Sequence, residues 1–377
     1  MNDIAILTKG AGISKDQLSE SGEPCILYGE LYTKYKSEII EDVISKTNIP
    51  TDKLIKSKAN DVLIPCSGET AVDIATARCV LSDNVLLGGD LNIIRLKHHD
   101  GSFMSYQLNG KRKYDIAKVA QGVSVVHLYG ENLKGIVTYN PQIEEQKKIV
   151  GLLSLLDERI ATQNKIIGDL KKLKSAIIDY IFNNEVLSFR KRIHLSDVAT
   201  KITQKNTNNH VSNVLSNSAN QGIIPQSEVF DREIANEDNT SNYFVISQND
   251  FVYNPRKSAT APYGPINRYY GQTDGVISPL YLCFRSHNID VEYLGWYFKS
   301  DSWHKFVYQN GDTGVRHDRV SIKDEIFFSM PLFIHNADEQ IEIAKRLNKI
   351  ESFVKQEEQY LFLLESQKLY LLQQMFI

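Results

Sequence analysis

Two stretches of the chain carry apolar residues at steps of alternately four and three. In residues 142–182, the series that starts at Ile149 reads Ile, Leu, Leu, Ile, Gln, Ile, Leu, Lys, Ile, Ile. In residues 338–376, the series that starts at Ile343 reads Ile, Leu, Ile, Val, Glu, Leu, Leu, Lys, Leu, Met. This heptad spacing predicts two coiled-coil helices, each about 60 Å long at about 1.5 Å per residue. The expected helix-seam residues are Ile149, Leu153, Leu156, Ile160, Ile343, Leu347, Ile350 and Val354.

Polar residues interrupt both apolar series at the same two places. Gln163 corresponds to Glu357, and Lys174 corresponds to Lys368. A polar group at a core position lowers stability but fixes register and partner choice. The alternative is that these positions lie in a splayed or hydrated part of the seam, and the sequence leaves both interpretations open.

The remaining residues are rich in short strand-like runs separated by turn residues. Examples are Val62–Ile64, Asn92–Leu96, Tyr243–Ile246, Tyr281–Phe284 and Ile326–Phe328. We therefore expect an α+β fold. The expected domains are 1–140, a helix at 141–182, a second globular domain at 183–337, and a helix at 338–377.

An internal repeat with an offset of 194 residues relates the two halves. Glu145-Gln146 recurs as Glu339-Gln340, Phe182 as Phe376, and Asp3 as Asp197. The starts and ends of the halves match, whereas their middles match poorly. The pattern indicates two similar scaffolds that carry different contents.

Composition excludes several classes of protein. The chain has 377 residues, with 43 basic and 46 acidic side chains and a net charge of −3, which counts against coating nucleic acid by bulk charge alone. No apolar run is long enough to span a membrane, and the N-terminus does not resemble a signal peptide. Its four cysteines form no C-x-x-C pair, so we expect a cytoplasmic protein without a disulfide framework.

Signatures of catalysis are absent from the sequence. Gly10-Ala11-Gly12 begins a dinucleotide fingerprint, but Lys15 stands at the third glycine position. Asn140-Pro141 and Asn254-Pro255 lack the following Pro and aromatic residue of amino-methyltransferases. No H-E-x-x-H motif is present. We therefore expect no catalytic residue, metal or cofactor in this chain.

Several polar and aromatic segments are candidates for contacts with DNA. Residues 251–273 contain no acid, three cations and five Phe or Tyr residues. Arg and Asn side chains can form bidentate contacts with base edges, while Lys and Tyr can hold phosphates. The alternative is a surface loop with Tyr packed beneath it. The candidate DNA-binding residues are Lys34, Tyr35, Lys36, Ser67, Glu69, Thr70, Gln121, Ser124, His127, Asn254, Arg256, Lys257, Tyr263, Arg316, His317 and Arg319. The run Lys111–Lys113 is either a phosphate grip or a solvated basic turn.

The region around the first helix resembles a known family. Residues 140–149 read NPQIEEQKKI, residues 152–160 read LLSLLDERI, and residues 170–174 read LKKLK. This is similar to the central conserved region of the DNA-specificity subunits of type I restriction–modification systems. The pieces Gly10–Ser14, Tyr28–Glu30 and Gly88–Leu91 also resemble parts of one class of their target-recognition domains. The second helix departs from this pattern at two positions. Glu351 replaces the expected Asp, and Gln367 occupies the position equivalent to Leu173 of the first helix.

The resemblance implies a fold and a set of partners. Two target-recognition domains each read half of a split target in double-stranded DNA, and two antiparallel helices act as the spacer. Two modification (methyltransferase) subunits, which bind S-adenosylmethionine, and motor-nuclease restriction subunits are the implied partners. The chain itself is then not an enzyme, and alone it binds DNA weakly.

Two other functions remain open at this level. One is a two-headed scaffold that binds no DNA and uses a coiled coil to space its heads. The other is the specificity subunit of a two-subunit methylation system without a motor-nuclease.

Overall fold

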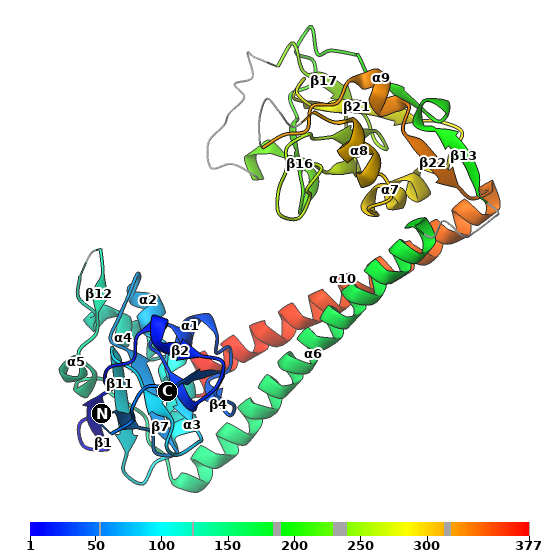
Figure 1. Ribbon diagram of the computed structural model, residues 1–377. Coiled ribbons are helices and arrows are strands. Elements are labelled where there is room, and N and C mark those ends of the chain that lie inside the picture. The colour runs from blue at the N-terminus through cyan, green and yellow to red at the C-terminus, as the bar shows by residue number, and fades with distance from the viewer. Residues whose placement is uncertain (53, 123, 184–189, 229–239, 313–317, 377) are drawn as a thin grey trace. The chain divides into compact units, whose positions relative to one another are not determined.

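The computed structural model describes residues 1–377 except 53, 123, 184–189, 229–239, 313–317 and 377. Two long helices, α6 (Ile143–Asn183) and α10 (Ala337–Gln374), begin and end within two residues of the predicted stretches, which confirms both. Contacts divide the chain into two compact units. Unit 1 is Met1–Ile166 with Glu357–Ile377, and unit 2 is Ile167–Gln356. Each unit contains a globular α+β domain and part of both helices (Figure 1).

The domain of unit 1 is built on two five-stranded sheets. The first has the order β1 (Ala5–Lys9), β11 (Leu91–Leu96), β7 (Asp61–Pro65), β9 (Arg78–Val80), β4 (Ile39–Ile40). The second has the order β2 (Leu18–Ser19), β5 (Ser45–Thr47), β3 (Glu23–Ile26), β10 (Leu86–Leu87), β6 (Ile55–Lys56). A small third sheet pairs β12 (Val126–His127) with β8 (Ser67–Gly68). The helical segments are η1 (Lys15–Gln17), α1 (Glu30–Thr33), α2 (Ala71–Ile74), α3 (Gly101–Asn109), α4 (Lys113–Val119) and α5 (Gly130–Lys134).

The domain of unit 2 is likewise built on two main sheets, each with four strands. One four-stranded sheet has the order β14 (Ala199–Lys201), β21 (Leu282–Ser286), β18 (Phe251–Tyr253), β19 (Ile266–Arg268). The other has the order β16 (Gly222–Pro225), β15 (Val214–Ser218), β20 (Gly275–Ile277), β17 (Phe244–Ile246). A third sheet pairs β13 (Lys191–His194) with β22 (Pro331–Ile334). The helical segments are η2 (Leu195–Asp197), η3 (Gln226–Glu228), α7 (Val291–Lys299), α8 (His304–Asn310) and α9 (Asp324–Phe328).

The two domains therefore share a topology that their sequences do not show. β14-β21-β18-β19 corresponds to β1-β11-β7-β9, and β15 is parallel to β20 as β3 is to β10. Strand pairing depends mainly on the backbone and on which face is buried, so side chains can diverge while the order persists. The repeat thus extends through the middles of the halves.

An ion pair between a buried aspartate and a more exposed arginine occurs at the same place in both domains. Asp61 is 1% exposed and accepts two bonds from Arg95, at 2.9 and 2.6 Å. Asp250 is fully buried and accepts two bonds from Arg285, both at 2.7 Å. Each aspartate follows an asparagine with positive φ, an αL residue at the start of β7 or β18. These bidentate pairs connect the central strand to its neighbour β11 or β21.

One predicted strand is a helix. Ile326–Phe328 belongs to α9, which has Asp324 and Glu325 in its first turn. Phe327 is fully buried in the aromatic core of unit 2. Three consecutive apolar residues do not distinguish a buried strand from a short buried helix, whereas acids in the first turn favour the helix.

The two long helices run antiparallel. The first part of α6 shares unit 1 with the last part of α10, and the reverse holds in unit 2. Among the expected seam residues, Leu153, Leu347 and Val354 are buried, and the remaining five are partly buried. Leu153 lies in a cluster with Phe103, Leu372 and Phe376, so the start of α6 and the end of α10 pack into the domain of unit 1.

Candidate nucleic-acid interface

In unit 1, two candidate segments lie side by side. Ser67 of β8 is paired with His127 of β12 in an antiparallel ladder. Leu128 N donates to Cys66 O at 2.8 Å, and the backbones of Gln121 and His127 exchange two bonds at 2.9 and 2.7 Å. Tertiary structure therefore brings residues 65–70 next to residues 120–127, which are about 55 positions apart in sequence.

In unit 2, the two corresponding segments pair in the same way. Arg256 forms an antiparallel bridge with Arg319. Val320 N donates to Pro255 O at 2.9 Å, and Lys257 N donates to Asp318 O at 2.8 Å. The predicted contacts Arg316 and His317 lie outside the described residues.

These two ladders occupy equivalent positions. Ser67 follows β7 and Arg256 follows β18, which are equivalent strands. Cys66 O accepts a hydrogen bond from Leu128 N, and Pro255 O accepts one from Val320 N in the same way. His127 therefore corresponds to Arg319. One backbone frame thus carries Ser and His in unit 1 but two Arg in unit 2. Two DNA-binding domains that recognise different bases would need different side chains at equivalent backbone positions.

The exposed side chains of the unit 1 ladder are polar but hardly basic. Gln121, Ser124 and His127 are exposed, as is Glu69. Thr70 is also exposed, and its hydroxyl accepts a bond from Asp73 N and so caps α2. Ser67 is buried, and its hydroxyl lies 3.1 Å from Asp90 Oδ2. The Ser67 hydroxyl is thus engaged inside the domain and does not face the exposed surface of the ladder.

The ladder of unit 2 is richer in cations. Arg256 is exposed, whereas Lys257 and Arg319 are partly buried. Arg319 Nε has no hydrogen-bond partner among the described residues, although Asp318 lies 3.8 Å away. Asn254 has a structural role, because it donates to Asn217 O at 2.9 Å and accepts from Arg256 N at 3.0 Å.

Four other predicted contacts are not part of the paired strands of these ladders. Tyr35 is 7% exposed, belongs to a core cluster and accepts a bond from Ile44 N, so its burial removes it from the interface. Lys34 is held by Glu30 at 2.6 Å and by Ser45 at 2.8 Å. Lys36 is exposed and lines a cavity beside the long helices. Tyr263 packs on His304 of α8 with ring centroids 4.9 Å apart.

The structure adds two residues that the sequence did not single out. The ring of Tyr129, 47% exposed, stacks on His127 with centroids 6.2 Å apart. Lys9 Nζ lies 5.6 Å from the centre of the Tyr129 ring. Lys9 is at the end of β1, more than a hundred residues before Tyr129, so no local motif could have connected them.

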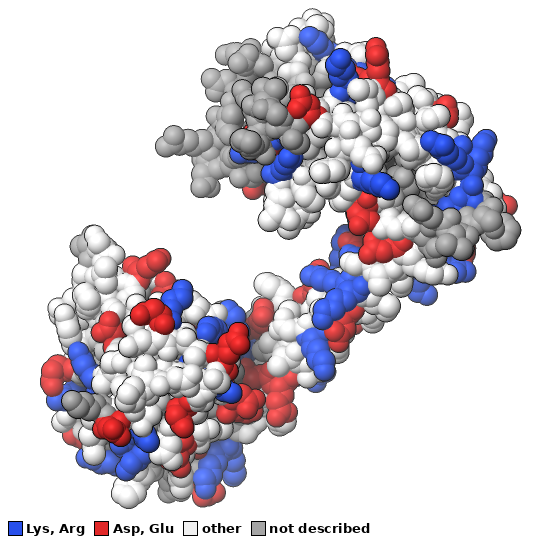
Figure 2. Space-filling view, viewed as in Figure 1, with Lys and Arg blue, Asp and Glu red and all other residues white. Residues whose placement is uncertain are grey.

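Surface charge is mixed in each unit. In the view of Figure 2, Lys and Arg side chains are interspersed with Asp and Glu over the domains, without a broad basic patch. This agrees with the net charge of −3.

Each domain is anchored to a long helix by the repeated glutamine. Gln146 is 1% exposed, accepts from Asp100 N at 2.9 Å and donates to Pro141 O at 2.7 Å. Gln340 likewise accepts from Asp290 N at 3.0 Å and donates to His335 O at 2.8 Å. The two aspartates cap α3 and α7. The repeated motif thus fixes where each helix leaves its domain.

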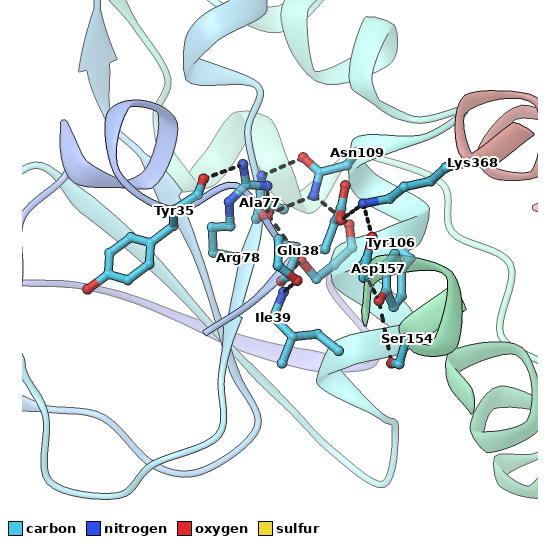
Figure 3. Close-up of polar contacts among 12 residues, drawn as sticks. Tyr35, Glu38, Ile39, Ala77, Arg78, Tyr106, Asn109, Ser154, Asp157 and Lys368 are labelled. Carbon is cyan, nitrogen blue, oxygen red and sulfur yellow. Dashed lines mark hydrogen bonds and ion pairs between the residues drawn. The ribbon is translucent and has the colours of Figure 1, made fainter. Parts of the chain in front are cut away.

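The polar seam residues bond across the helix pair. Lys368 Nζ lies 2.5 Å from both Asp157 Oδ1 and Glu38 Oε2, and Tyr106 OH donates to Asp157 at 2.7 Å (Figure 3). Its repeat counterpart Lys174 pairs with Glu351 at 2.6 Å. Because 174 and 351 map to 368 and 157 under the 194-residue offset, the two ion pairs are equivalent.

The remaining polar pair marks the middle of the helix pairing. Gln163 Nε2 donates to the backbone oxygen of Glu357 at 3.1 Å and also to its carboxylate. In an antiparallel pair of equivalent helices, a residue meets its own repeat counterpart only at the midpoint. These bonds support a role in register rather than a splayed seam.

No catalytic centre is evident in the described parts of the chain. Burial raises the pKa of the thiols of Cys25 and Cys66 to about 11 and of Cys79 and Cys283 to about 12, so all four stay protonated and unreactive at neutral pH. Among the described residues, no group of three His, Cys, Asp or Glu could hold a metal ion. No described helix is long and apolar enough to cross a membrane.

Comparison with known proteins finds a similar domain in the first part of the chain. Residues 1–172 match the family model of the type I restriction modification DNA specificity domain. The type I restriction enzyme MjaVIII specificity subunit of Methanocaldococcus jannaschii is 28% identical over 165 residues, which are 42% of this chain and 38% of that protein. The match therefore spans well under half of that relative.

Solved structures show the same fold over the whole chain. The S subunit of a type I restriction–modification system from M. genitalium covers 100% of this chain and 94% of its own, with a TM-score of 0.57 and 15% identity. A structure described as showing complex assembly and conformational transition of the type I R-M system covers 98% and 95%, with a TM-score of 0.61 and 13% identity. Residues 1–172 are thus similar to the type I restriction modification DNA specificity domain, and the whole chain shares the fold of the solved S subunit.

Proposed function

We propose that the chain is the non-catalytic DNA-recognition subunit of a type I restriction–modification complex. It reads a bipartite target in double-stranded DNA and directs adenine N6-methylation or restriction by its partner subunits. The observation that carries this proposal is the pair of equivalent ladders, one in each unit, with Gln121 and His127 on one and Arg256 and Arg319 on the other. Such duplicated readers joined by paired helices suit two half-sites at a set spacing.

The domain limits proposed from the sequence fit this role. Residues 1–140 and 183–337 are the two target-recognition domains, and 141–182 and 338–377 are the spacer helices. The chain itself requires no cofactor, because methyl transfer belongs to the modification subunits. The alternative is a two-headed scaffold protein that binds no DNA. The band-shift assay described next distinguishes the two functions.

A band-shift assay tests DNA recognition directly. Mapping of N6-methyladenine in host DNA, with and without the gene, gives the bipartite motif that is lost. A duplex carrying that motif is then titrated with the chain alone and with the modification subunit. We expect weak binding alone and selective binding in the complex, since the chain has little net positive charge. Absence of sequence selectivity in both titrations contradicts the proposal.

The exposed apolar face of the helices suits the modification subunit. In unit 1, Leu152, Leu155 and Leu363 are 50%, 65% and 56% exposed around a groove of about 330 Å³. Contiguous exposed apolar side chains on paired helices are typical of helix docking. We propose that helices of two modification subunits bind along the pair, and that motor-nuclease subunits join this assembly.

Charges on this face are expected to abolish assembly. The double variant Leu155→Asp and Leu363→Asp places two carboxylates where apolar contact would form, so the affinity for the modification subunit should fall at least about a hundredfold. Size-exclusion chromatography with light scattering measures it. The variant Lys165→Asp and Lys171→Asp, at exposed polar positions of α6, is the control and should assemble normally. Equal loss in both variants would refute the proposed face.

A further inference from the structure

A cavity of about 880 Å³ lies in unit 1 between the recognition domain and the two long helices. The domain contributes Arg78, Asn109 and Lys113, and the helices contribute Ile160 and Leu369 among others. This volume falls in the range of small-molecule sites, and the lining combines apolar side chains with a few polar groups. Among the lining residues, Lys36 alone is also a candidate DNA contact.

Arg78 is a buried cation without an acidic partner. It is 8% exposed, and its two terminal nitrogens donate to the backbone oxygens of Ala77 and Tyr35, both at 3.0 Å (Figure 3). Its Nε has no hydrogen-bond partner among the described residues. A buried guanidinium normally faces a carboxylate or another anion, because an uncompensated charge is costly to bury.

Lys113, at the start of α4, lines the same cavity and adds a second such charge. It is partly buried and forms no ion pair with any described residue. Burial and the nearby charge of Arg78 both lower the pKa of its ammonium group. Two neighbouring cations that repel each other in a partly enclosed space are a site that an anion would stabilise.

Three acids line the cavity, Glu38, Asp157 and the exposed Glu365, and none forms an ion pair with Arg78 or Lys113 among the described residues. Glu38 and Asp157 both contact Lys368 at 2.5 Å, so their bonds are directed to that ammonium. Burial lowers the pKa of Arg78, and the charges of Glu38 and Asp157 oppose that shift only in part. Lys36, which lines the same cavity and is exposed, adds positive charge there.

The equivalent cavity of unit 2 differs in charge. Ser175 and Ile178 of α6, which correspond to Leu369 and Leu372, line a smaller space of about 410 Å³. The side chains there include Lys299 but also the acids Asp179 and Asp301. Asn267 occupies the position that Arg78 has in unit 1. Arg78 pairs with the residue two positions after Asp61, and Asn267 pairs with the residue two positions after Asp250. The unit 2 cavity thus contains two acids near its end of α6 and has no arginine at the position of Arg78.

We propose that the cavity of unit 1 binds a small phosphorylated ligand whose phosphate is held by Arg78 and Lys113. A phosphate carries close to two negative charges at neutral pH and accepts several hydrogen bonds, which matches two cations. The apolar residues Ile160, Leu369 and Leu372 suit an organic portion of the ligand. A duplex backbone does not fit, because a guanidinium that is 8% exposed lies too deep for it. A bound ligand would contact the recognition domain and both helices of unit 1.

The test uses the full chain in phosphate-free buffer. Inorganic phosphate, pyrophosphate and AMP are titrated by calorimetry and by thermal unfolding, with chloride keeping the ionic strength constant. We expect the wild-type chain to bind at least one probe and its Tm to rise with that probe. The variant Lys113→Met should weaken the affinity at least tenfold. The variant Lys111→Met, an exposed neighbour outside the cavity, should leave it unchanged.

Stability without ligand separates a binding role from a structural one. Because Lys113→Met removes repulsion with Arg78, its Tm without probe should equal or exceed that of the wild type. No binding of any probe, equal effects of both lysine variants, or a lower ligand-free Tm of Lys113→Met would overturn the proposal. A short duplex that displaces the probe and shares its dependence on Lys113 would show that DNA is the source of phosphate, which also overturns it. None of these outcomes depends on recognition of a specific DNA target.

Discussion

Replacement of Lys368 by methionine is expected to lower the free energy of unfolding by about 3 kcal/mol. The ammonium group lies 2.5 Å from both Glu38 and Asp157, and the three side chains are 14%, 9% and 14% exposed. Without Lys368, two poorly hydrated carboxylates remain close to each other and unpaired. Urea titration at pH 7 measures the change.

The repeat supplies the matched control. Lys174 pairs with the single carboxylate of Glu351, at side-chain exposures of 21% and 25%, so Lys174→Met is expected to cost about 1 kcal/mol. Losses of equal size would show that the second carboxylate, Glu38, adds nothing. The comparison isolates what distinguishes the two ends of the helix pair.

The pH dependence of the two pairs follows from the direction of their pKa shifts. Burial alone lowers the pKa of Lys368, but the carboxylates of Glu38 and Asp157 raise it above its ordinary value. The stabilisation is therefore complete below about pH 10.4 and is lost as the pH rises through the folded pKa. Burial alone raises the pKa of Glu351, but the bond and charge of Lys174 lower it. That stabilisation is present above the unfolded pKa and is lost as the pH falls through the folded one.

The double variant Arg256→Ala and Arg319→Ala is expected to weaken binding of the complex to its DNA target at least about a hundredfold. Each bidentate contact with a base discriminates by about 1–3 kcal/mol, and these two side chains are adjacent in the ladder of unit 2. The loss should be confined to one half-site, so duplexes mutated in that half should no longer be rejected. Binding titrations of half-site variants measure both effects.

Arg192→Ala is the control for net charge. Arg192 is an exposed cation of β13 in the same unit, and its loss should weaken binding slightly and equally for all sequences. Conversely, Gln121→Ala with His127→Ala should relax the other half-site. Uniform weakening by the Arg256 and Arg319 variant, without loss of selectivity, would make them phosphate contacts and not readers of bases.

Most of the long-range organisation is encoded in periodic and repeated positions. Heptad spacing predicts α6 and α10, because each helical turn adds an apolar residue to the same face. This pattern depends only on residues within the helix. The repeated Gln146 and Gln340 mark the equivalent helix starts. The polar positions Gln163, Lys174 and Lys368 were also visible as interruptions, although their partners were not.

The candidate interface was only partly predictable. Sequence patterns selected the segments around Ser67, His127, Arg256 and Arg319 as polar turns, but not that they pair. They also selected Tyr35, whose aromatic ring fills a core between strands. An aromatic residue next to lysines has the same local pattern whether its ring is exposed for stacking or buried for packing.

By itself, the sequence determined the two helices, the two-fold repeat and the family resemblance. These features depend on the spacing of residues along one element or on motifs a few residues long. Tertiary structure decided which loops meet, which side chains stay exposed, and which acid pairs with each seam lysine. Partners such as Ser67 and His127, or Glu38 and Lys368, are tens to hundreds of residues apart. Their contact depends on strand register and helix packing, which no local pattern encodes.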